Sequence, residues 1–544
     1  MSTPDPTRLP RQIPYIIASE GCERFSFYGM RNILTTFLAG AFFANLGAEA
    51  VQGEAGSFRM FAALPSKAAE AAAKDVFHTF VAGVYFFPLL GGWLSDRFFG
   101  KYRTILWVSL LYCLGHGFLA KFEDNQNGFY AGLFMIAVGS GGIKPLVSSF
   151  VGDQFDQHNK HRAKVVFDAF YWSINFGSFF ASLLMPKLLD GWGPAMWWDL
   201  SPASVAFGVP GILMLLATLV FWLARKRYVR VPPAPPDPDS FLRVVWTALT
   251  RKQAGEGSPG LVIAIIGLVL ALGSLSLLYF APSLKLVKPI CIALLFLLLG
   301  GGIGAWIQLE RARGVHPDEA VDGVRSVLRV LVIFALVTPF WSLFDQKAST
   351  WVFQAKNMET PSWIGPPQMQ ALNPALVMLL IPLNNLVLFP LLRRRGFEIS
   401  QLWRMGLGIA LAGCSWIAAG ALQLVLDARY EVSIFWQLLP YVLLTLGEVL
   451  VSATGLEFAY SQAPKSMKGA IMAFWSLAVT FGNVWVLIVD ETVKRPAVTD
   501  LIAKTGISLT AFLMFFFAAF ALSAAFAFSR VARRYQMVDY YRQA

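Results

Sequence analysis

The sequence predicts an all-α protein that crosses the membrane many times. Of its 544 residues, 56% are hydrophobic and 14% are charged, and the mean hydropathy is +0.56, whereas soluble chains carry about a quarter charged residues. Apolar runs of about 18 residues or more recur along the chain, and each is long enough for a transmembrane helix. Lys and Arg gather in the loops between these runs. These observations argue against a soluble globular protein.

Twelve of the apolar runs divide into two sets of six. The first set lies at residues 14–43, 76–96, 103–121, 129–151, 165–189 and 204–226. The second set lies at residues 326–351, 372–393, 402–426, 435–460, 467–489 and 506–531. Between the sets, after a proline-rich linker, come two further apolar runs at 259–281 and 288–309. The sequence therefore predicts fourteen transmembrane helices, arranged as two six-helix bundles plus an inserted helix pair.

The runs also set the predicted domain boundaries. These are an N-terminal tail at 1–13, an N-terminal six-helix bundle at 14–228, a linker at 229–258, the inserted pair at 259–312, a C-terminal six-helix bundle at 313–534 and a C-terminal tail at 535–544. Alternate loops are rich in Lys and Arg, for example the loop with Arg97, Lys101 and Arg103. Positive residues near helix ends stay on the cytoplasmic side. We therefore expect both termini and the linker in the cytoplasm.

The net charge of +12 would suggest nucleic acid in a soluble chain, but here the basic residues occupy the loops and act as topology determinants. The four cysteines lie singly inside apolar runs, with no C-x-x-C spacing. This pattern predicts neither disulfides nor a metal centre.

Three of the four charged residues inside the first apolar run, Glu20, Glu23 and Arg24, lie within five positions of one another. At about 100° per residue, they and Tyr28 share one face of the helix. Each ionised group at the centre of a membrane helix costs about 2.5–3.5 kcal/mol, so this face must contact partners or a polar cavity. Two interpretations fit: a neutralised cluster that holds helices together, or a functional site.

Further ionisable residues lie inside later runs. Lys144 follows three glycines and precedes Pro145, so its helix is locally weakened where a cation enters the membrane. Asp345 lies in the outer half of its run, and Glu448 lies near the middle of another. Glu457, nine residues after Glu448, faces the opposite side near the cytoplasmic end. We expect Glu448 to reach a midplane site and Glu457 to have a structural or inner-gate role.

Five stretches, in order along the chain, resemble motifs of one family. The stretch "EGCERFSFYG" resembles the ExxERFxYYG signature of the proton-dependent oligopeptide transporter (POT or PTR) family, a branch of the major facilitator superfamily. The stretch "GGWLSDRFFGKYRT" resembles that family's loop between the second and third helices, and "FYWSINFGS", "FWSLFDQKAST" and "GLEFAYSQAP" resemble its fifth-, seventh- and tenth-helix motifs. The chain departs from the signature at Phe27, which lacks the hydroxyl of the family's tyrosine.

The resemblance implies the major facilitator fold, in which two six-helix bundles flank a central cavity that opens alternately to either side. Members couple inward proton flow to uptake of di- and tripeptides. The expected partners are therefore such peptides, protons and the lipid bilayer, with no nucleic acid and no cofactor, and a monomer is expected. The loop between the ninth and tenth helices is too short for the extracellular domain of animal members, which favours a bacterial inner (plasma) membrane.

The resemblance also implies a substrate site. Short peptides share one carboxylate, one ammonium and a few amides. Arg24 and Lys144 would bind the carboxylate, Glu448 would bind the ammonium, and neutral polar groups would bind the amides. The other expected substrate-binding residues are Tyr28, Tyr85, Asn175, Asn373, Trp341 and Trp475, the two tryptophans as pocket walls. Plainer alternatives stay open: the asparagines could hydrogen-bond between helices, and the aromatic residues could be packing.

Proton coupling is expected at Glu20, Glu23, His78 and Asp345. His78 lies on the face of Tyr85 and resembles a second-helix histidine of mammalian members, although a satisfied interfacial histidine is equally consistent.

The expected gating residues are Arg31, Asp345, Lys144 and Glu448. Arg31 lies seven residues past Arg24 and nearly on its face. We expect it to pair with Asp345 as an outer latch in the inward-facing state.

Other functions fit the sequence less well. A membrane enzyme would need a catalytic set, but the five histidines are scattered singly. A receptor would fit seven spans better than two sets of six. A channel is not excluded by composition, and counterflow would separate it from a carrier. Among carriers, the alternative substrate is another anionic or peptide-like solute, such as nitrate.

Overall fold

The computed structural model describes residues 10–43, 67–155, 163–193, 199–233, 237–253, 257–276, 287–396, 400–462 and 467–537. Within these ranges the secondary structure is helical apart from two isolated β-bridges. Of the predicted terminal tails, residues 1–9 and 538–544 lie outside the described residues. The predicted all-α class is confirmed.

The chain forms two compact units. Unit 1 comprises Met1–Pro233, Asp345–Asn385 and Ala421–Thr445, and unit 2 comprises Ala234–Phe344, Leu386–Gly420 and Leu446–Ala544. Several long helices therefore contribute residues to both units. The domain boundaries drawn from the sequence remain predictions.

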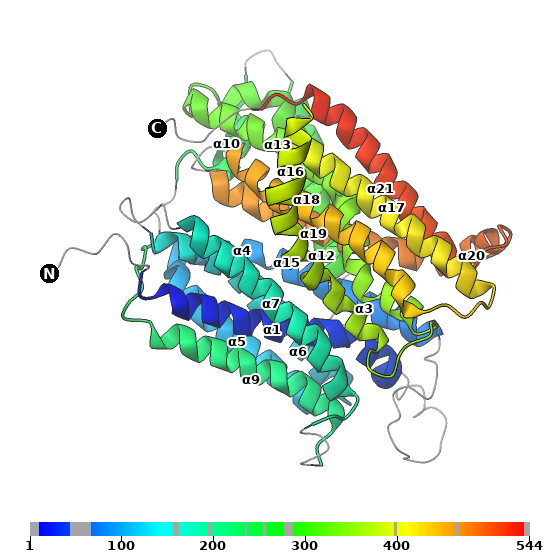
Figure 1. The fold of residues 1–544 in the computed structure, drawn as a ribbon. Helices are drawn as coiled ribbons and strands as arrows, with labels where there is room; N and C mark the ends of the chain where they lie inside the picture. Colours follow the sequence, from blue (N-terminus) through cyan, green and yellow to red (C-terminus); the bar gives the residue numbers. More distant parts are fainter. Residues whose placement is uncertain are drawn as a thin grey trace. The chain divides into compact units, whose positions relative to one another are not determined.

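Unit 1 is built mainly from the first helices of the chain. Its helices are α1 (Ile13–Phe37), α3 (Lys67–Phe86), α4 (Pro88–Leu94), α5 (Gly100–Lys121), α6 (Gln126–Asp153), α7 (Ala163–Leu189), α9 (Pro202–Leu223), α14 (Thr350–Ala355), the 3-10 helix η8 (Pro366–Ala371) and α15 (Leu372–Leu383). Helix α1 packs against α7 and α9, and α5 packs against α6 and α9 (Figure 1). Helix α1 is thus enclosed, which explains why its charged residues are buried.

Glycines set how closely these helices approach. A methyl group at Gly139 on α6 would lie 2.6 Å from the Cβ of Tyr112 on α5, and one at Gly141 would lie 2.8 Å from the carbonyl oxygen of Val84 on α3. Both distances are far below van der Waals contact, so only glycine fits at these two places. The close approach brings α5 and α3 against the stretch of α6 that carries Lys144.

Unit 2 contains the inserted pair and the later helices. They are α10 (Phe241–Thr250), α11 (Pro259–Leu275), α12 (Val287–Gln308), α13 (Asp318–Asp345), α16 (Phe389–Arg394), α17 (Gln401–Asp427), α18 (Leu438–Ser461), α19 (Lys468–Val493), α20 (Pro496–Ala503) and α21 (Leu509–Arg534). Helices α11 and α12 pack on each other, and a methyl group at Gly267 would lie 2.8 Å from the Cα of Gly300. The two apolar runs predicted as an inserted pair therefore pack backbone against backbone.

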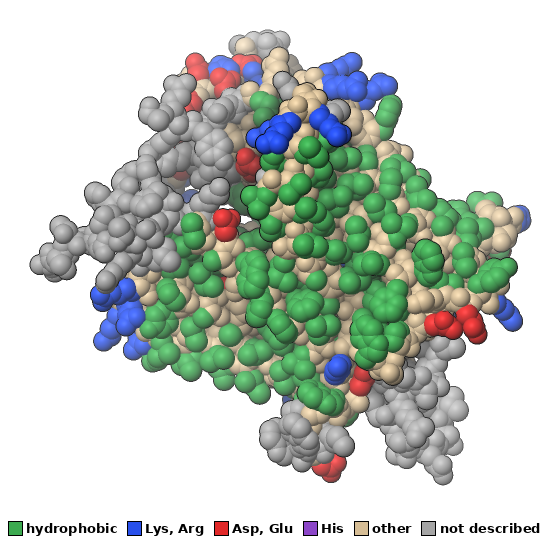
Figure 2. Space-filling view, in the orientation of Figure 1, with side chains coloured by type: hydrophobic (Ala, Val, Ile, Leu, Met, Phe, Trp, Pro, Cys, Tyr) green, Lys and Arg blue, Asp and Glu red, His purple; other side chains and the backbone are tan. Residues whose placement is uncertain are grey.

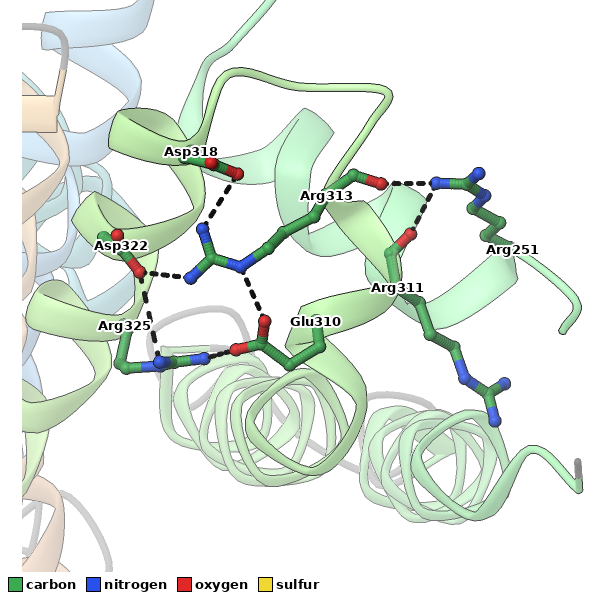
Figure 3. A network of polar contacts seen from close by, with 7 residues as sticks. All are labelled: Arg251, Glu310, Arg311, Arg313, Asp318, Asp322 and Arg325. Atoms are coloured by element: carbon green, nitrogen blue, oxygen red, sulfur yellow. Dashed lines mark hydrogen bonds and ion pairs between the residues drawn. The ribbon is translucent and has the colours of Figure 1, made fainter.

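A network of charged side chains joins α10 to the connection between α12 and α13 (Figure 3). Arg313 pairs with Glu310 at 2.6 Å, Asp318 at 2.9 Å and Asp322 at 2.6 Å. Arg251 donates to the main-chain carbonyls of Arg311 and Arg313, at 3.0 and 2.7 Å. Exposed charges are solvated at little cost, so this network belongs at helix ends outside the hydrocarbon, where the sequence predicts the cytoplasmic side.

The described helices have the length and surface of a polytopic membrane protein. By length and composition, ten of them could cross a membrane, and one of these stretches, Lys67–Lys121, contains two of the predicted spans. Helix α1, which carries four buried charged residues, is not among the ten. Hydrophobic side chains are spread widely over the described surface on the face drawn in Figure 2. The number fourteen remains a prediction.

Candidate functional site

A buried ion cluster lies on α1. Arg24 Nε is 2.6 Å from Glu20 Oε1 and 2.8 Å from Glu23 Oε2. The three residues are 5%, 3% and 2% exposed, respectively. Glu20 and Arg24 are four residues apart and therefore neighbours on the helix surface. With two carboxylates for one guanidinium, the cluster has one acid more than its base neutralises, which suits a group that binds and releases a proton.

Lys144 on α6 lies between two aromatic rings. Its Nζ is 3.7 Å from the ring centroid of Phe27 and 4.6 Å from that of Tyr85. In the part of the chain that the structure describes, this buried ammonium has no hydrogen-bond partner. The ring faces attract the cation, but they are not conventional hydrogen-bond acceptors for its three N–H groups. Lys144 can therefore still bind an anion.

The pair Arg31–Asp345 is present. Arg31 Nη2 is 2.5 Å from Asp345 Oδ1, and the two residues are 6% and 2% exposed. The guanidinium also lies 5.3 Å from the ring centroid of Phe77 on α3. The sequence predicted this pairing, and it joins α1 to the last residue of α13 within unit 1.

Three further polar contacts of unit 1 involve predicted residues. His78 Nε2 is 3.1 Å from Ser349 Oγ. Lys347 Nζ donates to Asn373 Oδ1 at 3.0 Å, and Asn373 Nδ2 donates to Thr445 Oγ1 at 3.1 Å. Both ends of the Asn373 amide thus have partners, an arrangement that also suits the interhelical alternative. Sequence reasoning assigned no role to the buried Lys347, although a lysine two residues after Asp345 in an apolar run was a visible sign.

Of the remaining residues predicted in unit 1, Tyr28 and Tyr85 lie near Arg24 and Lys144. Tyr28 contacts Phe27 edge to face, with ring centroids 5.3 Å apart. The Tyr85 hydroxyl lies close enough to Tyr28 and Arg24 to interact with them electrostatically. Asn175 on α7 donates to the carbonyl of Tyr171 at 3.0 Å. The structure therefore brings Arg24, Tyr28, Tyr85 and Lys144 together, while Asn175 has a contact within its own helix.

Three predicted residues belong to unit 2. Trp341 and Trp475 pack edge to face, with ring centroids 6.1 Å apart and planes at 84°, and a side chain at Gly455 would overlap the Trp475 ring. Glu448 is half-buried on α18. Glu457, on the same helix, is exposed and lies 3.9 Å from Arg404 Nη2. The two glutamates of α18 thus differ in burial.

The sequence model described as "PTR2: POT family" matches residues 102–507, well over half of the chain. The chain belongs to the POT family. One relative of this chain is "Peptide transporter 3" of Caenorhabditis elegans. The two are 31% identical over 436 residues, which are 78% of this chain and 52% of the relative. Another is "Solute carrier family 15 member 2" of Mus musculus, 28% identical over 462 residues, or 82% of this chain and 54% of the relative. The chain thus spans about half the length of these curated relatives.

Two crystal structures of POT family proteins match this chain over nearly its whole length. An "auto inhibited POT family peptide transporter" is 60% identical, with a TM-score of 0.88 over 98% of this chain and 99% of the other. The "POT family transporter PepTSo" is 59% identical, with a TM-score of 0.90 over 98% and 100%. The chain therefore has the major facilitator fold, and its relatives are transporters rather than enzymes.

Proposed function

We propose that the protein is a proton-coupled symporter that imports di- and tripeptides by alternating access. The observation that supports this most is the buried Lys144 ammonium, which lies between Phe27 and Tyr85 within electrostatic range of Arg24. Its three N–H donors have no acceptor among the described residues, so an anion can bind there. A peptide carboxylate is such an anion. The other terminus of the peptide would bind Glu448.

The neutral residues complete the proposed peptide site. The tyrosines and asparagines of unit 1 would bind the peptide amides, and Trp341 and Trp475 would line the space for varied side chains. These residues are Tyr28, Tyr85, Asn175 and Asn373. Sequence-independent recognition needs fixed groups for the constant atoms of a peptide and adaptable apolar surface for the rest. A carrier of nitrate or another small anion would need the cations but not Glu448.

Proton coupling is proposed at the acids that contact these cations, and at His78. A proton on Glu20 or Glu23 removes its attraction for Arg24, and a proton on Asp345 removes its attraction for Arg31. Both changes act on ion pairs that are buried, where charge is costly. The gradient would supply the driving force without a cofactor. We further propose a monomer in a bacterial inner membrane, with both termini in the cytoplasm.

The function is tested by uptake of a labelled dipeptide into proteoliposomes. With an inward proton gradient, we expect accumulation above the equilibrium level, and addition of a protonophore should return it to equilibrium. Labelled nitrate under the same gradient is the comparison for the alternative substrate. Accumulation of nitrate but not of the dipeptide would contradict the proposal.

The outer latch is tested by Asp345→Asn. This change keeps the volume of the side chain but removes the charge that pairs with Arg31 at 2.5 Å, as permanent protonation would. Breaking one side of a buried pair costs about 3–5 kcal/mol, so the state that contains the pair should become less populated and the outward-open state more populated. Labelling of single cysteines from each side, at two pH values, measures this shift. In the variant we expect labelling that depends less on pH than in the parent protein.

Asp427→Asn is the control for this variant, because Asp427 is exposed at the end of α17. It should keep the pH dependence of the parent protein. An Asp345→Asn protein that does the same would rule out the latch.

A further inference from the structure

A second polar cluster lies beside Glu23, where α1, α5 and α6 meet. It consists of Ser26, Tyr112, His116 and Ser140, each of which is 0% exposed. Ser26 Oγ is 2.9 Å from His116 Nε2, and the rings of Tyr112 and His116 stack with centroids 5.1 Å apart. Four polar side chains are thus enclosed among membrane helices, where such groups are normally paired.

Several atoms of this cluster are not paired. Among the described residues, no hydrogen-bond partner exists for the Tyr112 hydroxyl, the Ser140 hydroxyl or His116 Nδ1, and the neighbouring Glu23 carboxylate has the ion pair with Arg24 at 2.8 Å but no further hydrogen bond. The Tyr112 hydroxyl nevertheless lies near Glu23, Ser26 and Ser140, because Gly139 lets α5 and α6 approach so closely. Buried polar groups that converge without direct partners are typically bridged by an ordered water. The cluster therefore has the donors and acceptors of a water site.

The surroundings of His116 indicate which groups of this cluster donate hydrogen bonds and which accept them. The main-chain carbonyl of Phe207 on α9 is the polar neighbour of the ring, although the geometry falls outside hydrogen-bond limits. A carbonyl favours the tautomer with its proton on Nδ1. In that tautomer Nε2 is an acceptor, and Ser26 must donate its hydrogen to it. The Ser26 oxygen can then accept a hydrogen bond, and the Tyr112 hydroxyl, which lies near both Ser26 and Glu23, can donate on one side while its oxygen accepts on the other.

We propose that Ser26, Tyr112, His116 and Ser140 form a water-binding pocket that accepts a hydrogen bond from the protonated carboxyl of Glu23. Glu23 would then have two alternative partners: Arg24 for the carboxylate, and the pocket, through its water, for the carboxyl. The proton arrives on Glu23, remains on that oxygen while it is bound, and leaves from the same oxygen. His116 stays neutral and orients Ser26. This inference rests on the proposed function, in which Glu23 carries the proton.

The charged groups around Glu23 are compatible with this exchange. Glu20 and Arg24 act on it from α1, Lys144 acts on it from α6, and the hydroxyl of Tyr112 reaches it from α5. Protonation of Glu23 leaves Arg24 paired with Glu20 at 2.6 Å. The guanidinium is therefore not left without a partner when Glu23 turns to the pocket.

Tyr112→Phe is the test, because it removes one acceptor of the pocket and keeps the ring. We expect the midpoint of the pH dependence of proton-driven uptake to move down by about one unit, a tenfold loss of proton affinity. The second readout is the infrared carboxylic C=O band that Glu23→Gln abolishes at low pH. In Tyr112→Phe this band should move to higher frequency, because its hydrogen bond is weaker. Ser140→Ala should cause smaller changes in the same directions.

Tyr441→Phe is the matched control. Tyr441 is also a buried tyrosine of unit 1 whose hydroxyl has no hydrogen-bond partner among the described residues, but its ring packs on Trp351. It should leave the midpoint and the band unchanged. A folded Tyr112→Phe or Ser140→Ala protein with the band and midpoint of the parent would overturn the pocket. Absence of proton-driven uptake in the parent protein would instead overturn the proposed function, and the infrared band would still decide the pocket.

Discussion

Replacement of Glu23 by Gln should abolish proton-driven peptide uptake and preserve counterflow. Glutamine has nearly the shape of glutamate, but its side chain neither gains nor loses a proton in the pH range of the assay. Arg24, which is 2.8 Å from Glu23 in the parent protein, keeps its pair with Glu20 at 2.6 Å. The helix should therefore fold normally. Counterflow exchanges labelled for unlabelled peptide without net proton movement, so it needs the peptide site but not the proton site.

The measurement compares two assays on one proteoliposome preparation: uptake driven by an inward proton gradient, and exchange at equal pH on both sides. Glu431→Gln is the control, because it makes the same chemical change at an exposed side chain. It should behave as the parent protein in both assays. If Glu23→Gln loses both activities, the carboxylate has a structural role and the assignment is wrong.

The second large effect is expected from Glu448→Gln. If Glu448 binds the amino terminus of the peptide, the variant loses a hydrogen bond to a charged group, which contributes about 1.5–3 kcal/mol. Affinity for dipeptides with a free amino terminus should therefore fall by about ten- to a hundredfold. An N-acetylated dipeptide has no charge at this end, so its weaker binding should change little. Competition against a labelled dipeptide gives both affinities.

Glu431→Gln is again the control, because its side chain is exposed and has no role in the proposed site. It should leave both affinities unchanged. Equal losses for the free and the acetylated peptide in Glu448→Gln would mean that Glu448 shapes the site without binding the ammonium. Unchanged affinity for both would remove Glu448 from the peptide site.

Much of the architecture could be predicted because it follows from local composition. The hydrophobic runs predict helices, since only a helix satisfies its own backbone within the hydrocarbon. The helices α6 and α21 overlap runs predicted at 129–151 and 506–531. The ion cluster on α1 was also accessible, because Glu20 and Arg24 are four residues apart and any helix makes them neighbours.

Contacts across the fold were harder to predict, and they were found from the sequence only where charge restricted the choice. Arg31 and Asp345 are 314 residues apart, yet each is a buried charge that needs a partner of opposite sign. Neutral polar residues carry no such requirement. Tyr112, His116, Ser26 and Ser140 lie in runs where aromatic and small residues are ordinary packing, and nothing in the sequence indicates that they meet.

The sequence by itself determined that this is a helical membrane protein, where its helices lie along the chain, and that charges are buried in them, because the bilayer excludes other solutions. The tertiary structure decided which of those charges meet. Lys144 lies against Phe27 and Tyr85, and the Ser26–His116 pair lies beside Glu23, because glycines such as Gly139 and Gly141 let neighbouring helices approach within contact of the backbone. Helix rotation and register depend on such shape complementarity across the whole interface, which no local stretch of sequence contains.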